Sequence, residues 1–125
     1  MSIFTSTEIH PDYQEHQIER IKTYLRSTTV VSIIESVEEG NIEIAQVLHG
    51  FVAGDETGRY EHEDIVISSP IQYTKDCNTR FFTKTGSYYV SVEEVDYVTL
   101  TLPEWLTMCN TLMTPKDIIC YRYLH

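Results

Sequence analysis

Basic residues are scarce in this chain of 125 residues. Nine Lys and Arg stand against nineteen Asp and Glu, which leaves a formal net charge of -10 at pH 7. Nucleic-acid binding needs a cationic surface that displaces counterions from phosphates, and adhesion to an anionic membrane needs the same kind of charge. The composition therefore excludes direct nucleic-acid and membrane binding and favours a positively charged partner.

Cysteine and glycine are also too few for several kinds of site. The three cysteines, Cys77, Cys109 and Cys120, form no CxxC pair, and an odd count is typical of a reducing cytoplasm. Five glycines form no phosphate-binding loop, and no signal-peptide pattern or apolar run of roughly 18 residues is present. We expect a cytoplasmic protein with Cys109 and Cys120 buried in apolar surroundings and Cys77 exposed.

The usual spacings of catalytic and metal-binding residues are missing too. His10 and His16 are six residues apart, so they do not share a helical face, and His62 has no second ligand at the required spacing. The run from Asp55 to Gly58 lacks the alternating acids of a calcium loop, and no GxSxG motif occurs. We therefore predict no catalytic residue, no metal and no cofactor.

What the chain does contain is the composition of one globular domain. Hydrophobic residues make up 42% and charged residues 22%, and a chain of this length can bury a hydrophobic core without disulfide bonds or bound metal ions. No linker or repeat divides it. We expect residues 1–125 to form a single α+β domain, an antiparallel sheet of about five strands with an N-terminal helix and a short C-terminal helix packed on one face.

Two segments have helical spacing or caps. Ile18, Ile21 and Leu25 recur at intervals of three and four, which predicts a helix from about Pro11 to Arg26. Thr101, followed by Pro103 and Glu104, has the pattern of a helix N-terminus. The expected buried face of this second helix consists of Trp105, Leu106, Met108, Cys109 and Leu112.

Strands are expected where β-branched and alternating residues occur. Gly40-Asn41 and Lys84-Thr85-Gly86 are predicted turns of two hairpins. The expected strands are Ser27–Ile34, Ile42–Val52, Asp64–Ser68, Thr79–Thr83, Ser87–Val92 and Tyr97–Leu100, with Ile118–Tyr123 as a last strand or a docked extended segment.

The acids are concentrated in two parts of the sequence. Nine lie between Glu35 and Asp64 with only Arg59 to oppose them, and three more lie within residues 93–96. If the turn at Gly40 and the loop near Gly58 lie at the same end of the sheet, the first group forms one continuous negative surface. Such a surface complements a cationic protein groove; the simpler interpretation is that acid-rich loops keep the protein soluble.

Tyrosine is abundant, with nine residues, and it is enriched at protein interfaces because it offers a large contact area with a polar tip. An acidic surface with interspersed tyrosines favours a protein partner over a small substrate. The residues expected to contact that partner are Glu38, Glu39, Glu43, Asp55, Glu56, Tyr60, Glu61, Glu63 and Asp64.

One segment carries a resemblance. Gly58-Arg59-Tyr60 and the run from Ile65 to Ser69, within the stretch from Gly50 to Ile71, resemble a pattern of small acidic phage- and prophage-encoded proteins without assigned function. His62-Glu63 stands where that pattern has an Asp-Gly turn. The resemblance covers about 20 residues and carries no catalytic residue; it implies a mobile genetic element, where small acidic proteins often block host defence.

The expected function is therefore a non-enzymatic inhibitor that covers a basic, nucleic-acid-handling surface of a protein partner in the host cytoplasm. An anti-CRISPR or other anti-defence protein, acting as a monomer or homodimer, is the concrete form. An immunity protein that neutralises a basic nuclease toxin uses the same charge complementarity and stays an alternative. A small enzyme or ligand-binding domain with a tyrosine-lined pocket at His49 is the third; no role for His49 or His62 follows from the sequence.

Overall fold

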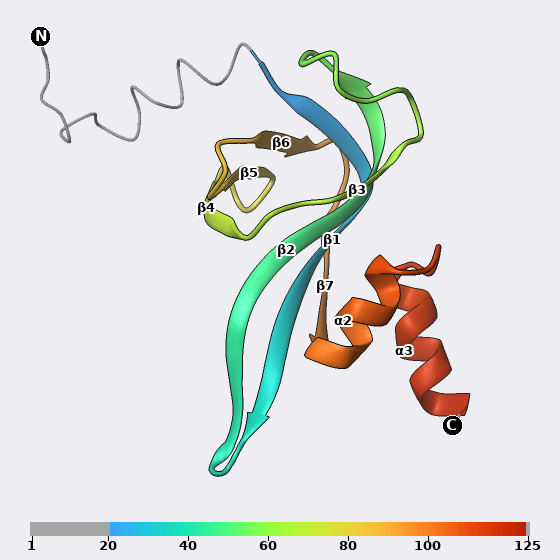
Figure 1. Cartoon of the computed structure of the whole chain (residues 1–125). Coiled ribbons are helices and arrows are strands. Elements are labelled where there is room, and N and C mark those ends of the chain that lie inside the picture. Colours follow the sequence, from blue (N-terminus) through green and yellow to red (C-terminus); the bar gives the residue numbers. More distant parts are fainter. Residues whose placement is uncertain (1–20, 125) are drawn as a thin grey trace, which may run out of the picture.

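The computed structural model describes residues 21–124, which form one sheet of seven strands and two helices (Figure 1). The strands are β1 (Thr23–Val37), β2 (Gly40–Asp55), β3 (Ile65–Ile67), β4 (Ile71–Lys75), β5 (Arg80–Thr83), β6 (Tyr88–Ser91) and β7 (Asp96–Thr101). They are followed by α2 (Leu102–Cys109) and α3 (Pro115–Leu124). The α+β expectation is confirmed, but the sheet has seven strands instead of about five, and β4 matches none of the expected strands.

The dominant feature is the long antiparallel hairpin of β1 and β2, which the sequence predicts. Its register runs from Thr23 opposite Asp55 to Val37 opposite Gly40. At about 3.3 Å per residue the hairpin is about 50 Å long. Its turn projects well beyond the rest of the fold (Figure 1). Gly40 has a φ of 129°, a conformation that other residues rarely adopt.

β1 is the central strand, and its pairing corrects the expectation of a purely antiparallel sheet. The strand order is β3-β2-β1-β6-β5-β4, and β7 also pairs with β1. Both β6 and β7 run parallel to β1, β6 along Thr23–Leu25 and β7 along Thr29–Ile34. β1 is thus paired on both edges over most of its length.

The predicted N-terminal helix is wrong in its last turn. Its residues up to 20 lie outside the described part of the chain, but Thr23–Arg26 belong to β1. Thr23 and Leu25 are fully buried while Tyr24 is only partly so, which is the period-two alternation of a strand. Pairing with both β2 and β6 outweighs the helical spacing of the apolar residues.

At the other end of the chain, one helix is confirmed and one is a correction. Thr101 caps α2: its hydroxyl accepts a hydrogen bond from the Glu104 N–H, and the Glu104 carboxylate accepts one from the Thr101 N–H. The segment expected to be extended at Ile118–Tyr123 is instead part of α3. Its start is capped by a reciprocal pair between Thr114 and Asp117. Neither helix in residues 21–124 is long and apolar enough to cross a membrane.

The core lies on both faces of the hairpin. On one face the hairpin packs against β3, β5 and β6 through Leu25, Val30, Leu48, Val52, Val66, Phe81 and Tyr89. On the other it packs against β7, α2 and α3 through Val31, Ile33, Val47, Leu100, Met108 and Ile118. The two helices cover this second face (Figure 1). The hairpin beyond them has no cover within the described residues.

The buried face of α2 is narrower than expected. Met108 is fully buried and Trp105 is half-buried, whereas Leu106 and Leu112 are exposed. Leu112 lies beyond the helix, which ends at Cys109. Cys109 and Cys120 are exposed, which corrects the expectation of buried thiols, and Cys77 is exposed as expected.

Candidate functional site

The uncovered end of the hairpin is the first candidate surface; we call residues 35–44 the hairpin arm. Every residue of the arm is exposed, and it contains no Lys or Arg. Its four acids are Glu35, Glu38, Glu39 and Glu43, and none forms an ion pair with another residue in the described range 21–124. Glu43 accepts one hydrogen bond from the Gln46 side chain, at 3.3 Å.

Apolar side chains accompany these acids. Val37, Ile42 and Ile44 are each between 44% and 48% exposed. Glu35 is opposite Ile42 and Val37 is opposite Gly40 in the register, so Val37 and Ile42 extend the hairpin face that is covered further up by α2 and α3. The arm therefore combines unpaired negative charge with uncovered apolar area.

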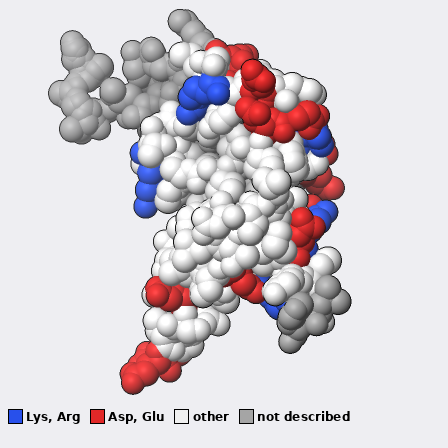
Figure 2. All heavy atoms as spheres, turned by 45° about the vertical axis from the view of Figure 1, so that its right-hand side comes forward, with Lys and Arg blue, Asp and Glu red and all other residues white. Residues whose placement is uncertain are grey.

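The expected single acidic surface is wrong, because the acids divide between the two ends of the hairpin. β2 runs without interruption from Gly40 to Asp55, so the turn at its start and the loop at its end are separated by the whole strand. Figure 2 shows acidic side chains at the lower tip of the molecule and again near its top, with other charged side chains along the right-hand flank between them.

At the loop end, Asp55 is an internal anchor rather than a free carboxylate. It accepts hydrogen bonds from the Thr23 hydroxyl at 2.7 Å and the Thr57 hydroxyl at 2.7 Å, and from the backbone N–H groups of Arg59 and Tyr60, each at 2.8 Å. Partial burial raises the pKa of Asp55, but these hydrogen bonds outweigh it and hold the pKa far below the ordinary range. Asp55 thus holds the loop against β1.

Glu63 is neutralised by the chain's own cation. Arg26 donates two hydrogen bonds to the Glu63 carboxylate, and its guanidinium lies 5.2 Å from the centroid of the Phe51 ring. These bonds lower the pKa of Glu63. The Glu63 side chain also lies beside His62.

The remaining candidate residues of the loop differ in whether their side chains have a partner within the chain. Glu56 pairs with Lys22 at 3.8 Å, and Asp64 accepts a hydrogen bond from the Glu61 N–H at 2.9 Å. Tyr60 is half-buried against the core, with its hydroxyl 3.5 Å from that of Tyr89. Burial and this contact raise the pKa of Tyr89 to about 12. Of the loop acids in the described residues, only the Glu61 carboxylate has no internal partner.

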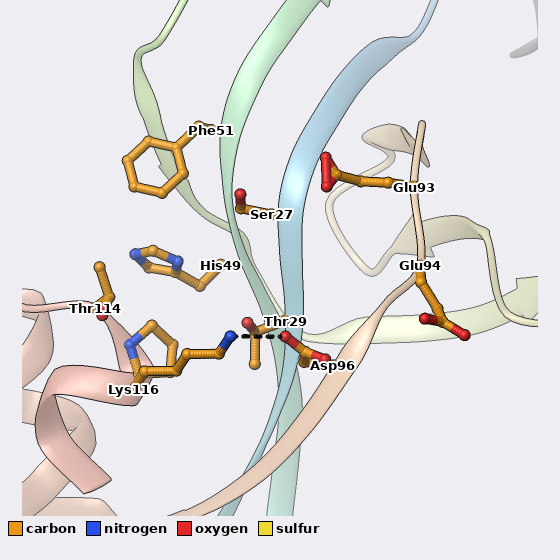
Figure 3. Close-up of a pocket in the computed structure, with 10 residues that line it drawn as sticks. Ser27, Thr29, His49, Phe51, Glu93, Glu94, Asp96, Thr114 and Lys116 are labelled. Carbon is orange, nitrogen blue, oxygen red and sulfur yellow. Dashed lines mark ion pairs between the residues drawn. The ribbon is translucent and has the colours of Figure 1, made fainter. Parts of the chain in front are cut away.

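A second candidate is a pocket of about 290 Å³ where β1 and β2 meet the β6–β7 connection and the start of α3 (Figure 3). Its lining consists of Ser27, Thr29, His49, Phe51, Glu93, Glu94, Asp96, Thr114, Pro115 and Lys116. The sequence suggested a pocket formed by His49 and tyrosines. His49 does line this pocket, but none of the lining residues is a tyrosine. The feature of the sequence that points to this pocket is a titratable residue, His49, within the otherwise apolar run from Val47 to Phe51.

His49 is the most unusual group in this pocket. It is only 2% exposed, contacts the Phe51 ring edge-to-face at 5.7 Å, and its imidazole makes no hydrogen bond to any of the residues from 21 to 124. Burial lowers its pKa, an effect that the nearby Asp117 carboxylate opposes. The imidazole is therefore neutral near pH 7.

A break in the β1–β2 pairing lies at the pocket. The β1–β2 register shifts between Arg26 and Thr29, so Ser27 and Thr28 have no partner on β2. Ser27 has a φ of 51°, a left-handed conformation that costs a non-glycine residue roughly 1 kcal/mol or more. Bulges and strained residues of this kind are frequent at functional sites.

No group of three or more His, Cys, Asp or Glu side chains among the described residues is arranged to hold a metal ion. Comparison of the chain with family models, curated proteins and solved structures found no match. The two candidate surfaces therefore have to be judged on their own chemistry.

Proposed function

We propose that this protein is a non-enzymatic inhibitor that docks its hairpin arm onto a basic, nucleic-acid-handling surface of a protein partner. Compared with the sequence-based hypothesis, the contact set is reduced to the arm acids Glu38, Glu39 and Glu43, joined by Glu35. Asp55, Glu56, Tyr60, Glu61, Glu63 and Asp64 lie at the far end of the hairpin and are not part of this surface.

The observation that supports the proposal is the unpaired charge of the arm. Glu38 and Glu39 form the turn and are exposed, and no cation among residues 21–124 forms an ion pair with them. Carboxylates on a rigid projecting hairpin can occupy a groove that is built for phosphates, and they speed association through long-range attraction. The net charge of -10 opposes docking of a second copy on the same surface.

The apolar residues of the arm supply the short-range part of the interface. Ile42 is 48% exposed and Val37 is 44% exposed. Burying such side chains is favourable by roughly 25 cal/mol per Å² of apolar surface. Charge would then guide the encounter, while these two side chains would slow dissociation.

Two partner classes fit this chemistry, and purified proteins distinguish them. An RNA-guided nuclease complex represents the anti-defence function, and a basic nuclease toxin domain represents the immunity function. Titration of the protein against each, with inhibition of DNA binding or cleavage as the readout, identifies the class. Failure to inhibit members of either class at low salt contradicts the proposal.

The arm is tested by a matched pair of charge reversals. Glu39 and Glu61 are both exposed carboxylates without an ion pair in the described range, one on the arm and one at the opposite end. We expect E39K to weaken binding at least about tenfold, because a charge at the centre of an interface is worth about 1.4 kcal/mol or more. E61K should leave affinity unchanged; equal losses in both variants would contradict docking through the arm.

A further inference from the structure

The pocket at His49 contains a buried polar group whose hydrogen-bonding capacity is unused. A neutral imidazole has one donor and one acceptor nitrogen. The His49 nitrogens are not among the polar atoms of residues 21–124 that are sealed from solvent without a partner, so they stay open to the pocket. His49 lies on β2 opposite Thr29 of β1 and Ile67 of β3, next to the break in the β1–β2 register. In Figure 3 its ring lies between Phe51 and Thr114 at the pocket wall.

The charge around this pocket is negative. Lys116 pairs with Asp96 at 3.3 Å (Figure 3), which cancels one carboxylate. Glu93 and Glu94 have no ion pair with any described residue. Figure 3 shows the Glu93 side chain extending from the β6–β7 connection toward Ser27.

The two cations near the pocket, Arg26 and Lys116, each form an ion pair with a carboxylate of the chain. Arg26 interacts electrostatically with Glu93, but its guanidinium donates two hydrogen bonds to the carboxylate of Glu63. Lys116 is the remaining cation in the lining and belongs to the pair with Asp96. The net charge offered to a ligand is therefore negative.

The start of α3 does not turn this pocket into an anion site. Pro115 has no N–H, the Thr114 N–H donates to the Asp117 carboxylate, and the Asp117 N–H donates to the Thr114 hydroxyl. The donors that a helix N-terminus would present to a phosphate or carboxylate are largely used within the chain. An anionic ligand would also have to approach Glu93 and Glu94.

We propose that this pocket binds an organic cation, an alkylammonium or guanidinium group. In this arrangement Glu93 and Glu94 balance the ligand's charge and the acceptor nitrogen of His49 takes one of its N–H hydrogens. The rings of Phe51 and Pro115 contact the attached methylene groups. A volume of about 290 Å³ suits a ligand of this size.

The test uses three small probes of similar shape and different charge: butylamine, butanol and butyrate. Binding to the full chain is followed by NMR, through the imidazole resonances of His49. We expect butylamine to shift these resonances and to bind at least about tenfold more tightly than butanol, since the ion pair is worth about 1.4 kcal/mol or more. Equal affinities for butylamine and butanol, or tighter binding of butyrate, would overturn the proposal.

A pair of variants connects the binding to the pocket and separates it from the arm. E93Q/E94Q removes both unpaired carboxylates from exposed positions, and we expect it to weaken butylamine binding about tenfold or more. E38Q/E39Q removes the same charge from the arm and should leave butylamine binding unchanged. If the two variants bind butylamine equally well, its attraction is to overall charge and the pocket is excluded.

The same variants keep this proposal distinct from the proposed function. We expect E38Q/E39Q to lose inhibition of the partner and to keep butylamine binding, so this variant tests the arm and not the pocket. Nα-acetyl-lysine amide serves as a second probe. If it binds more tightly than butylamine, the cation is a lysine side chain of a protein; if it binds more weakly, the cation is a free amine.

Discussion

Arg122 of α3 donates two hydrogen bonds to the carboxylate of Glu104 in α2, from Nε at 2.9 Å and from Nη2 at 2.7 Å. Glu104 also accepts the Thr101 N–H in the α2 cap, and Arg122 also donates to the Thr99 carbonyl of β7. This contact joins both helices to the strand that carries them. The hydrogen bonds from Arg122 are the main reason that the pKa of Glu104 is lowered.

We therefore expect Arg122→Met to lower the free energy of unfolding by about 1 kcal/mol, as for a bidentate pair that is partly screened by solvent. Lys116→Met is the matched control, because its pair with Asp96 is more exposed and should contribute almost nothing. Urea denaturation at pH 7 measures both. Equal losses in the two variants would mean that the Arg122 contact has no special role.

Asp55 should make the protein sensitive to acid. Because its pKa is lower in the folded state, its stabilising contribution is complete above about pH 4 and is lost as the pH falls further. Asp55→Asn should cost about 1–3 kcal/mol at pH 7 and should weaken the dependence of stability on pH below 4. Chemical denaturation across this range tests it, with Glu61→Gln as a control of equal charge change. An unchanged acid profile in Asp55→Asn would contradict the anchoring role.

His49 should destabilise the fold at mildly acidic pH. Its folded pKa is lowered, so below about 6.5 the unfolded chain binds the proton more readily and stability falls as the pH drops. The Asp117 carboxylate opposes the effect of burial on the His49 pKa without cancelling it. NMR titration should give His49 a pKa below its ordinary value. His49→Gln should remove part of the stability loss between pH 7 and 5.

The three thiols should react without unfolding. Cys77, Cys109 and Cys120 are all exposed, so a thiol reagent should modify all three in the native protein. Partial burial raises the pKa of Cys109, and because the thiolate is the reactive form, Cys109 should react more slowly than a fully solvated thiol. Mass spectrometry of the labelled peptides provides the rates. A thiol that is protected until urea is added would contradict its exposed position.

Sequence patterns predicted the elements whose local signals agree with their tertiary surroundings. The hairpin of β1 and β2 and the turn at Gly86 were found because β-branched runs end at residues that tolerate a positive φ. The start of α2 was found because Thr101 and Glu104 form a capping box whose partners are three residues apart. These signals act over a few residues and need no knowledge of the fold.

The misses have a physical cause in each case. Thr23 and Leu25 are strand residues because β6 and β2 are both available to pair with them, which helical spacing could not reveal. The run at Ile118 favours a strand by propensity, yet the cap formed by Thr114 and Asp117 starts a helix that buries Ile118 against the sheet. The cap, not the β-branched run, was the more informative signal.

The single acidic surface expected from the sequence does not form. The turn at Gly40 and the loop after Asp55 flank a single predicted strand, and the two ends of an extended strand cannot meet. Which acids were neutralised could not be read from spacing, since Arg26 and Glu63 are brought together only by the pairing of β1 with β2. The pocket at His49 likewise lies beside the bulge at Ser27, which has no local signature in the sequence.

The placement of β1 between β2 and the pair β6 and β7 has a consequence for synthesis of the chain. The ribosome delivers β1 and β2 together, and their hairpin closes through neighbouring residues. The opposite edge of β1 waits for residues 88–101, since only they complete it. Contacts that span so much of the chain slow folding, and an unpaired edge is prone to aggregate in the meantime. The yield of this protein in a cell should therefore depend on how quickly translation passes through β7.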